Sequence, residues 1–494
     1  MVILIHHSSF IIRHSSFSIF HFSLFHFSLP LPLHFSPSTP VISDLTLHMK
    51  HADIAGPEQT EIRSTFFPAE WFPQSGVQLT WPHAATDWAD LLPEVDDCFI
   101  HIALEILVRN ERLLIVTPEP DRVKALFHER IPSRLLPQVT YFQCPTNDTW
   151  ARDHAFLTLM TEAGPRLLDF RFNGWGNKFP SDLDNAINQR LASQGPSPWP
   201  LSNSPRGGEG RPADDNTAND ARGHEILPPT GGVREGLLLK GTYSPHLDFV
   251  FEGGSIESDG RGTLLTTSEC LLSPHRNPHL NRQQIEERLL RYFHAERVLW
   301  LDHGYLAGDD TDSHIDTLAR FCPNDTIAYV QCTDPNDEHY EALHAMEQQL
   351  QGLPLSNRPL SNSPRGGEGR SADDNTANDA RGHEILPPAG SLPPTGGVGE
   401  GPGLYQLIPL PMPSPIYDPD DGHRLPATYA NFLVINGAVL MPTYGQPAND
   451  ELARAQLQKA FPRYDIVPID CRVLIRQHGS LHCSTMQYPL GVLC

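Results

Sequence analysis

A thirty-residue segment that occurs twice limits how much of this 494-residue chain can belong to a folded core. Residues 200–229 read PLSNSPRGGEGRPADDNTANDARGHEILPP and recur, with one substitution, at residues 359–388. Both copies are rich in Pro, Gly, Asn, Asp and Ser, so they cannot bury enough apolar surface to offset the entropy lost on ordering. Solenoid repeats would stack on adjacent copies, and these copies are far apart. We therefore expect two disordered surface insertions, at about 196–236 and 352–402.

The first 48 residues also differ from the rest of the chain. The tetrapeptides HSSF and HFSL each occur twice there, and His and Ser interrupt every apolar run. No run therefore approaches the roughly 18 apolar residues of a membrane helix. A secretory signal would combine a basic start, an uninterrupted apolar block and a small-residue cleavage site. We interpret residues 1–48 as a low-complexity leader outside the fold, upstream of a natural start near Met49; the alternative is a degenerate export signal.

Composition narrows the classes of partner. The chain carries 36 basic and 59 acidic residues, a formal charge of −23, which disfavours nucleic acid and anionic membranes as partners. A small cationic substrate suits such a surface, although excess acidity also serves solubility. The eight cysteines form no CxxC pairs, which argues against a zinc ribbon or a disulfide framework and favours reduced thiols in the cytoplasm.

Between the leader and the insertions, three blocks have globular composition, at about 49–195, 237–350 and 403–494. Short apolar runs typical of strands alternate there with amphipathic stretches typical of helices, which predicts one interrupted α/β domain over 49–494. The spacing leaves open whether the sheet is doubly wound or radial. The expected strands are 113–116, 249–251, 263–266, 298–301, 327–330 and 432–440, and the expected helices are 121–129, 281–293, 337–350 and 449–460.

Two segments carry groups that can attack an electrophile or transfer protons. Cys483, in LHCSTMQYP, follows a histidine, and a thiol beside a positive charge becomes a reactive thiolate; a small core cysteine is the other interpretation. In GDDTDSHID, His314 and Asp316 are two residues apart, so on an extended backbone both point to one face. One can move protons while the other holds a cation. A solvated acidic loop and a metal site are the alternatives, but no further His/Asp cluster at ligand spacing supports a metal.

Two other segments could bind a cation. In NDTWARDHAF, Asp148 and Asp153 flank Trp150 and Arg152; a carboxylate accepts two parallel N–H bonds from a guanidinium, and an aromatic face packs against the planar cation. A structural Arg–Asp pair is the alternative. In DFVFEGGSIESDG, Glu252 ends an apolar strand and two glycines follow. This places a carboxylate at a strand end, unless the segment is merely a hairpin turn.

The order of the motifs is more specific than any one of them. Together they resemble the agmatine deiminase family, which belongs with the bacterial-type peptidylarginine deiminases in the guanidino-group-modifying superfamily. The resemblance covers nearly all of the three blocks and neither the leader nor the repeats. The motifs that carry it are PAEW (68–71), LTWPH (79–83), NDTWARD (147–153), FNGWGNKF (172–179), EGGSIE (252–257), GDDTDSHID (308–316), YANFLVINGAVLMPTY (429–444) and HCSTMQYP (482–489).

The resemblance implies a pentein-like fold, a five-bladed α/β propeller of pseudo-symmetric ββαβ units with the site on its axis. It implies that Cys483 is the nucleophile and His314 the general acid/base. Asp153 and Asp316 would grip the guanidinium, with Glu252 as a further acidic partner. Agmatine would be hydrolysed to N-carbamoylputrescine and ammonia through a covalent thiouronium intermediate, without a metal or organic cofactor.

Three more residues, Trp71, Trp150 and Asp148, are expected to line the substrate pocket. The chain departs from the family pattern at Ser313, where glycine is typical, and in the glycine-poor run RQHGSLH before the cysteine. Neither change removes a reacting group.

Several alternatives remain open at this stage. The same chemistry serves peptidyl-arginine or another guanidino compound, and a non-catalytic guanidine-binding protein would keep the carboxylates. The two insertions could also impair folding or activity. The expected partner is a small cationic guanidino compound, neither nucleic acid nor membrane, and assembly into a homo-oligomer is left open.

Overall fold

The computed structural model describes residues 64–193, 238–355 and 403–494, which all belong to one unit spanning 62–494. The predicted leader and nearly all of both predicted insertions lie outside the described residues. In the described part no helix is long and apolar enough to cross a membrane.

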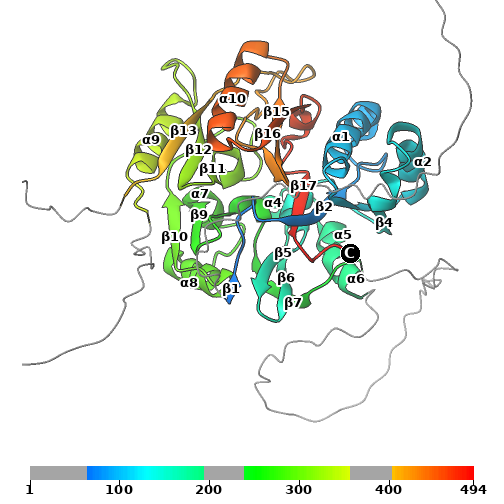
Figure 1. Ribbon diagram of the computed structural model, residues 1–494. Helices are drawn as coiled ribbons and strands as arrows, with labels where there is room; N and C mark the ends of the chain where they lie inside the picture. Colours follow the sequence, from blue (N-terminus) through cyan, green and yellow to red (C-terminus); the bar gives the residue numbers. More distant parts are fainter. Residues whose placement is uncertain (1–63, 194–237, 356–402) are drawn as a thin grey trace, which may run out of the picture. The chain divides into compact units, whose positions relative to one another are not determined.

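Five separate sheets make up this unit (Figure 1). Two sheets have four strands. The strand order of the first is β1 (Thr65–Phe66), β5 (Leu157–Thr161), β6 (Gly164–Arg171) and β7 (Thr242–Val250). The strand order of the second is β17 (Thr485–Pro489), β2 (Gln74–Thr80), β3 (Arg112–Thr117) and β4 (Val139–Gln143). Three sheets have three strands, and their orders are β10 (Arg297–Leu301), β9 (Thr263–Thr267), β8 (Glu257–Ser258); β11 (Ala319–Cys322), β12 (Thr326–Gln331), β13 (Gln406–Pro411); and β14 (Leu433–Ile435), β15 (Ala438–Thr443), β16 (Asp465–Asp470).

One connectivity recurs in all five sheets. Two antiparallel strands are followed by helical sequence and then by a strand parallel to the second, so each sheet contains a ββαβ unit. A parallel return needs such a crossover, and a helix supplies its length. The fifth unit joins the two ends of the described chain, because β17 pairs with β2. The crossover helices are α1 (Leu92–Leu107), α5 (Asp182–Asn185), α6 (Ile187–Ser193), α8 (Arg282–Phe293), α9 (Tyr340–Gln351) and α10 (Pro447–Ala460).

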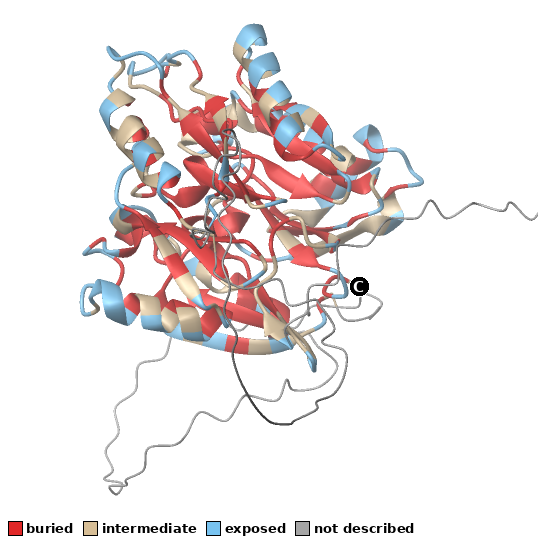
Figure 2. Ribbon diagram, turned by 60° about the vertical axis from the view of Figure 1, so that its left-hand side comes forward, coloured by how far each residue is buried: buried red, intermediate tan, exposed pale blue. Residues whose placement is uncertain are grey.

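The core consists of the sheets and of the helix faces packed on them, and the outer helix faces are exposed (Figure 2). Helix α8 shows why the sequence folds this way. Asn281 and Gln284 form a reciprocal capping box at its start, which satisfies two orphan N–H groups. Ile285 and Leu289, one turn apart, are then fully buried.

The predicted α/β class is confirmed, and most predicted elements lie where expected. Helix α2 (Pro120–Arg130) and α8, α9 and α10 each overlap a predicted helix. The continuous strand predicted over 432–440 is wrong, because this stretch is a hairpin of β14 and β15. Its turn contains Gly437 at φ 76°, a conformation that glycine adopts at little cost.

Candidate active site

Each predicted reacting group lies in a segment that ends just before the first strand of a ββαβ unit. Asp153 belongs to the short helix α3 (Ala151–His154) before β5, and Glu252 precedes a 3₁₀ turn that leads into β8. His314 and Asp316 lie at a second 3₁₀ turn before β11, and Cys483 precedes β17. The polar groups therefore lie at equivalent positions of the ββαβ units. Sequence periodicity alone could not show this equivalence.

The Cys483 side chain is 5% exposed, and its nearest polar neighbour was not predicted. Asn431, just before β14, places its Nδ2 at 3.2 Å and its Oδ1 at 3.4 Å from the sulfur. The same Oδ1 accepts from the backbone N–H of His482 at 2.8 Å. Asn431 thus holds both the thiol and the backbone of the turn. It lies in the motif YANF, but no spacing rule distinguishes it there.

Asp316 and His482 form a buried network behind the thiol. The Oδ2 of Asp316 lies 3.9 Å from the Cys483 sulfur and 2.7 Å from His482 Nδ1. On the other side of the ring, His482 Nε2 is 2.8 Å from Glu70 Oε2, and the Arg320 guanidinium contacts both groups. Burial would raise the pKa of Asp316, but the hydrogen bond and charge of His482 lower it. This carboxylate is therefore ionised.

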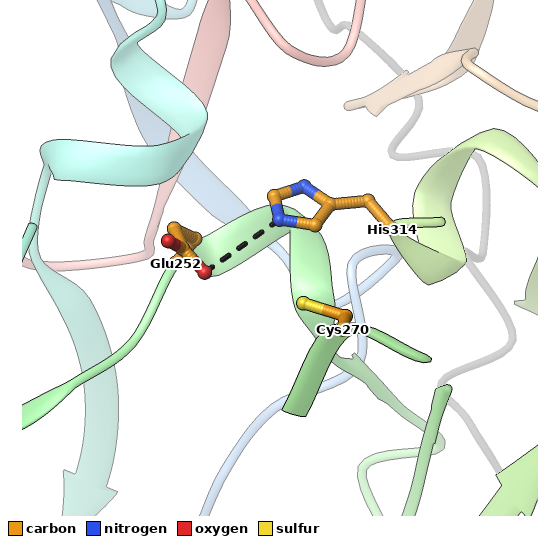
Figure 3. A group of neighbouring side chains, drawn as sticks. All are labelled: Glu252, Cys270 and His314. Atoms are coloured by element: carbon orange, nitrogen blue, oxygen red, sulfur yellow. Dashed lines mark ion pairs between the residues drawn. The ribbon is translucent and has the colours of Figure 1, made fainter. Parts of the chain in front are cut away.

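The imidazole of His314 is fully buried between two carboxylates. Its Nδ1 lies 3.7 Å from Asp153 Oδ1, and its Nε2 lies 3.7 Å from Glu252 Oε2 (Figure 3). Burial disfavours the charged ring, but Asp153, Cys270 and Glu252 together raise the pKa of His314 well above its ordinary value. The ring is therefore an imidazolium that can give up a proton.

Gly254 allows the closest approach in this centre. Its backbone N–H donates to Asp153 Oδ1 at 2.9 Å. A Cβ at this position would lie 2.6 Å from His314 Nδ1, 2.9 Å from Asp153 Oδ1 and 3.1 Å from Asp316 Oδ2. Only glycine fits among three functional groups at once. The indole of Trp175 donates to Asp153 Oδ2 at 2.9 Å and fixes the other side of that carboxylate.

Arg276 links Glu252 to the loop that carries His314. Its Nε donates to Glu252 Oε2 at 2.7 Å, and its Nη1 lies 2.6 Å from Asp312 Oδ2. Burial would raise the pKa of Glu252, but Arg276 and His314 lower it, so the carboxylate stays ionised. Asp309 braces the same loop by accepting from the backbone N–H of Ser313 at 2.7 Å. The acidic residues before the histidine therefore build the loop.

Ser313 occupies a left-handed backbone conformation at φ 62°, next to Asp312 at φ 61°. This geometry explains why glycine would be favoured directly before the histidine. In this chain, serine adopts the conformation while its N–H and C=O are held by Asp309 and Thr267.

Of the expected substrate-lining residues, Trp150 contacts the segment that leads to the thiol. Asp148 is occupied: its Oδ1 accepts from the Trp88 indole at 2.9 Å, and its Oδ2 accepts from the Trp150 indole at 3.0 Å. The Trp150 ring packs on Gly479, where a Cβ would lie 2.3 Å from it. Trp71 is partly buried against the core. Asp148 therefore positions Trp150 beside the loop that carries Cys483. The sequence did not reveal that both carboxylate oxygens of Asp148 would accept hydrogen bonds from tryptophan indoles.

The surroundings of Cys483 favour the neutral form of its thiol. Burial raises the pKa of Cys483 well above the ordinary value, and the charges of Asp316 and Asp153 raise it further. A cation placed between these carboxylates would reverse part of that effect. A cation bound there would therefore favour the thiolate.

Comparison with known proteins identifies the family of this chain. The sequence model of the Porphyromonas-type peptidyl-arginine deiminase family matches residues 66–361 and 400–489. The agmatine deiminase of Pseudomonas syringae pv. syringae is 30% identical over 441 residues, which cover 85% of this chain and 95% of that protein.

Solved structures show the same likeness. A protein from Porphyromonas gingivalis has a TM-score of 0.66 and 41% identity, and covers 87% of this chain and 100% of its own. A substrate-bound agmatine deiminase variant from C. jejuni has a TM-score of 0.62 and 31% identity, covering 86% and 96%. The chain therefore belongs to the Porphyromonas-type peptidyl-arginine deiminase family and is a hydrolase of guanidino C–N bonds.

Proposed function

We propose that this protein hydrolyses agmatine to N-carbamoylputrescine and ammonia through a covalent intermediate on Cys483. The observation that supports this most directly is the meeting of a thiol, an imidazolium and three carboxylates from segments far apart in the chain. The reacting residues are Cys483, His314, Asp153, Asp316 and Glu252.

The two carboxylates beside the thiol suit a guanidinium. Asp316 and Asp153 would accept the N–H groups of the substrate and aim its carbon at the sulfur, which replaces a bimolecular encounter with a positioned one. The bound cation also offsets the charges that keep the thiol protonated, so binding favours the thiolate. Nucleophile activation and substrate binding are then one event.

The reaction balances with these groups and water alone. As the substrate binds, Cys483 gives its proton to solvent, and the thiolate attacks the guanidinium carbon and forms a C–S bond. His314 protonates the departing nitrogen, the C–N bond breaks and ammonia leaves. Water then attacks the remaining thiouronium carbon, His314 accepts a proton from that water, and the C–S bond breaks to release the ureido product and the thiol.

We also propose that the five sheets are the blades of a closed propeller. Each sheet contributes a ββαβ unit, and each unit is preceded by a polar segment of the site. A radial arrangement would bring five equivalent segments to one axis, which accounts for this repetition.

A small substrate is favoured over a protein substrate by burial. The side chains of Glu252, His314 and Asp316 are at most 1% exposed, and Cys483 is 5% exposed. Relatives named as agmatine deiminases cover nearly the whole described chain. The family description names peptidyl-arginine, so deimination of arginine in peptides is the second candidate. We place the enzyme in the cytoplasm, where its free thiols stay reduced.

The deciding experiment offers the full-length protein agmatine, free arginine and an arginine-containing peptide, and measures ureido product for each. We expect kcat/KM for agmatine to exceed the other two by at least about 100-fold, because free arginine adds a carboxylate to its tail and a peptide is too bulky for reacting groups that are almost fully buried. A preference for the peptide would replace the first proposal with the second. No ureido product from any of the three would contradict both.

A further inference from the structure

A second cysteine faces the proposed acid/base histidine. Cys270 lies in the short helix α7 (Ser268–Leu271) and is fully buried. Figure 3 shows its sulfur beside the ring of His314, with Glu252 across from it. One ligand atom from each of these three side chains lies within 4.8 Å of the other two. The proposed reaction does not use this thiol.

Buried polar atoms in this cluster are incompletely bonded. Glu252 Oε1 makes no hydrogen bond, and the two ring nitrogens of His314 face carboxylate oxygens only at 3.7 Å, although both side chains are at most 1% exposed. Unsatisfied buried polar atoms are costly unless a ligand or ion completes them. Arg276 bonds to Oε2 of Glu252, which leaves Oε1 free to bind a ligand. These incompletely bonded atoms therefore indicate a ligand that can bind a carboxylate, an imidazole and a thiol together, as a metal ion does.

The negative charges around Glu252, Cys270 and His314 favour a cation as the ligand. Asp153 and Asp316 lie on the far side of the His314 ring, where both approach the position of a Cβ on Gly254. One thiolate, one imidazole and one carboxylate form a donor set suited to zinc, with a fourth position left for water. A hard cation such as Mg²⁺ would prefer oxygen ligands alone.

We propose that Glu252, Cys270 and His314 form an inhibitory site for a thiophilic divalent cation such as Zn²⁺. The metal would form bonds to the sulfur, one ring nitrogen and one carboxylate oxygen of Glu252. The Cys270 thiol proton and the extra proton of the His314 ring would pass to solvent. With its nitrogen on the metal, His314 could not protonate the leaving nitrogen. Binding of the metal does not depend on the proposed function, whereas inhibition by the metal rests on it.

The binding test uses Co²⁺ as a spectroscopic probe on the full-length Cys483→Ser variant, so that Cys270 is the thiol left beside His314. We expect a thiolate-to-cobalt charge-transfer band that saturates at about one equivalent. The band should be lost when Cys270→Ala is added, and kept when Cys144→Ala, at another buried cysteine, is added instead. Cys270→Ser serves in place of the alanine variant if the latter does not unfold cooperatively. Absence of the band, or its persistence without Cys270, would overturn the site.

The activity test measures inhibition by Zn²⁺ relative to each variant's own metal-free rate. We expect half-inhibition of the Cys270→Ala variant to need at least tenfold more Zn²⁺ than the wild type, and a chelator to restore wild-type turnover. Equal sensitivity of the two proteins would assign inhibition to another group, such as Cys483, and would refute the inhibitory role. If no guanidino substrate is turned over at all, the proposed function fails while the cobalt experiment still decides the metal site.

Discussion

Asp316 and His482 lie 2.7 Å apart, between Oδ2 and Nδ1, directly behind the Cys483 thiol. The imidazole bridges this carboxylate to Glu70, which in turn contacts Arg320. Because all four groups are buried, their charges compensate one another at low dielectric. Asp316 is thereby held ionised and in one orientation. In the proposed mechanism, His482 would be a positioning residue that acts on the substrate through Asp316.

The first prediction concerns this bridge. Replacing His482 by Gln should lower kcat by about 100-fold, because a small displacement of Asp316 misaligns the guanidinium. His478→Gln, four residues earlier and bonded to the Gly308 carbonyl, is the matched control and should stay within about twofold of wild type. Steady-state kinetics with agmatine checks both variants. Equal losses in the two variants would indicate a general effect on the turn.

The second prediction concerns the nucleophile. Cys483→Ala should abolish ammonia release and ureido product from agmatine, since no other group can form the covalent intermediate. The variant should unfold cooperatively near the wild-type temperature, because a methyl group replaces a small buried thiol. Cys332→Ala, at another buried cysteine, should keep its activity. Residual turnover by Cys483→Ala would remove the thiol from the mechanism.

The third prediction concerns the left-handed residue before His314. Ser313→Gly should leave turnover within about twofold, since glycine adopts φ 62° at little cost. Ser313→Val should lower the free energy of unfolding by about 1–3 kcal/mol, because a β-branched residue is strained in this conformation. Chemical denaturation measures both. A valine variant as stable as the glycine variant would contradict the backbone explanation.

The fourth prediction concerns pH. Burial raises the pKa of Glu111 from 4.5 to about 7, although the Asn436 N–H bonds its Oε1. The folded protein therefore binds this proton more tightly than the unfolded chain does. Its contribution to stability is fully present below about pH 4.5 and is lost as the pH rises to about 7.

Glu111→Gln should remove this loss. At pH 8 the variant should be more stable than wild type by about 1–3 kcal/mol, and at pH 4.5 the difference should shrink. Denaturant unfolding at the two pH values measures it. A constant difference across this range would rule out titration of Glu111 as the cause.

The fifth prediction concerns the second repeat. Leu355 and Gly403, the described residues on either side of it, are joined by a backbone hydrogen bond of 2.7 Å from N to O. Replacing residues 357–401 by a short Gly-Ser linker should therefore preserve cooperative unfolding and turnover, since a shorter closed loop costs less entropy. The predicted insertion, 352–402, began too early, because Pro354 already pairs with Leu404. Loss of cooperativity on deletion would show that the segment contributes to the core.

The sequence alone was enough for the class of fold and for the family, and it supplied the candidates for the reacting groups. Alternating strand-like and helix-like stretches predicted α/β, and the helix expected over 281–293 matches α8. The ordered motifs identified the family and named Cys483 and His314 as candidates. These features can be predicted from the sequence because secondary-structure propensity and motifs are properties of neighbouring residues.

Tertiary structure decided which groups meet. Asn431 contacts Cys483 across 52 positions of sequence, His482 contacts Asp316 across 166, and Glu70 contacts His482 across 412. No periodicity encodes such contacts. The same holds for Asp148, whose two oxygens are taken by indoles, and for Cys270, which joins Glu252 and His314 only in space. Charge, burial and hydrogen-bond satisfaction depend on distances between remote segments, so only the folded chain determines what each carboxylate and thiol can do.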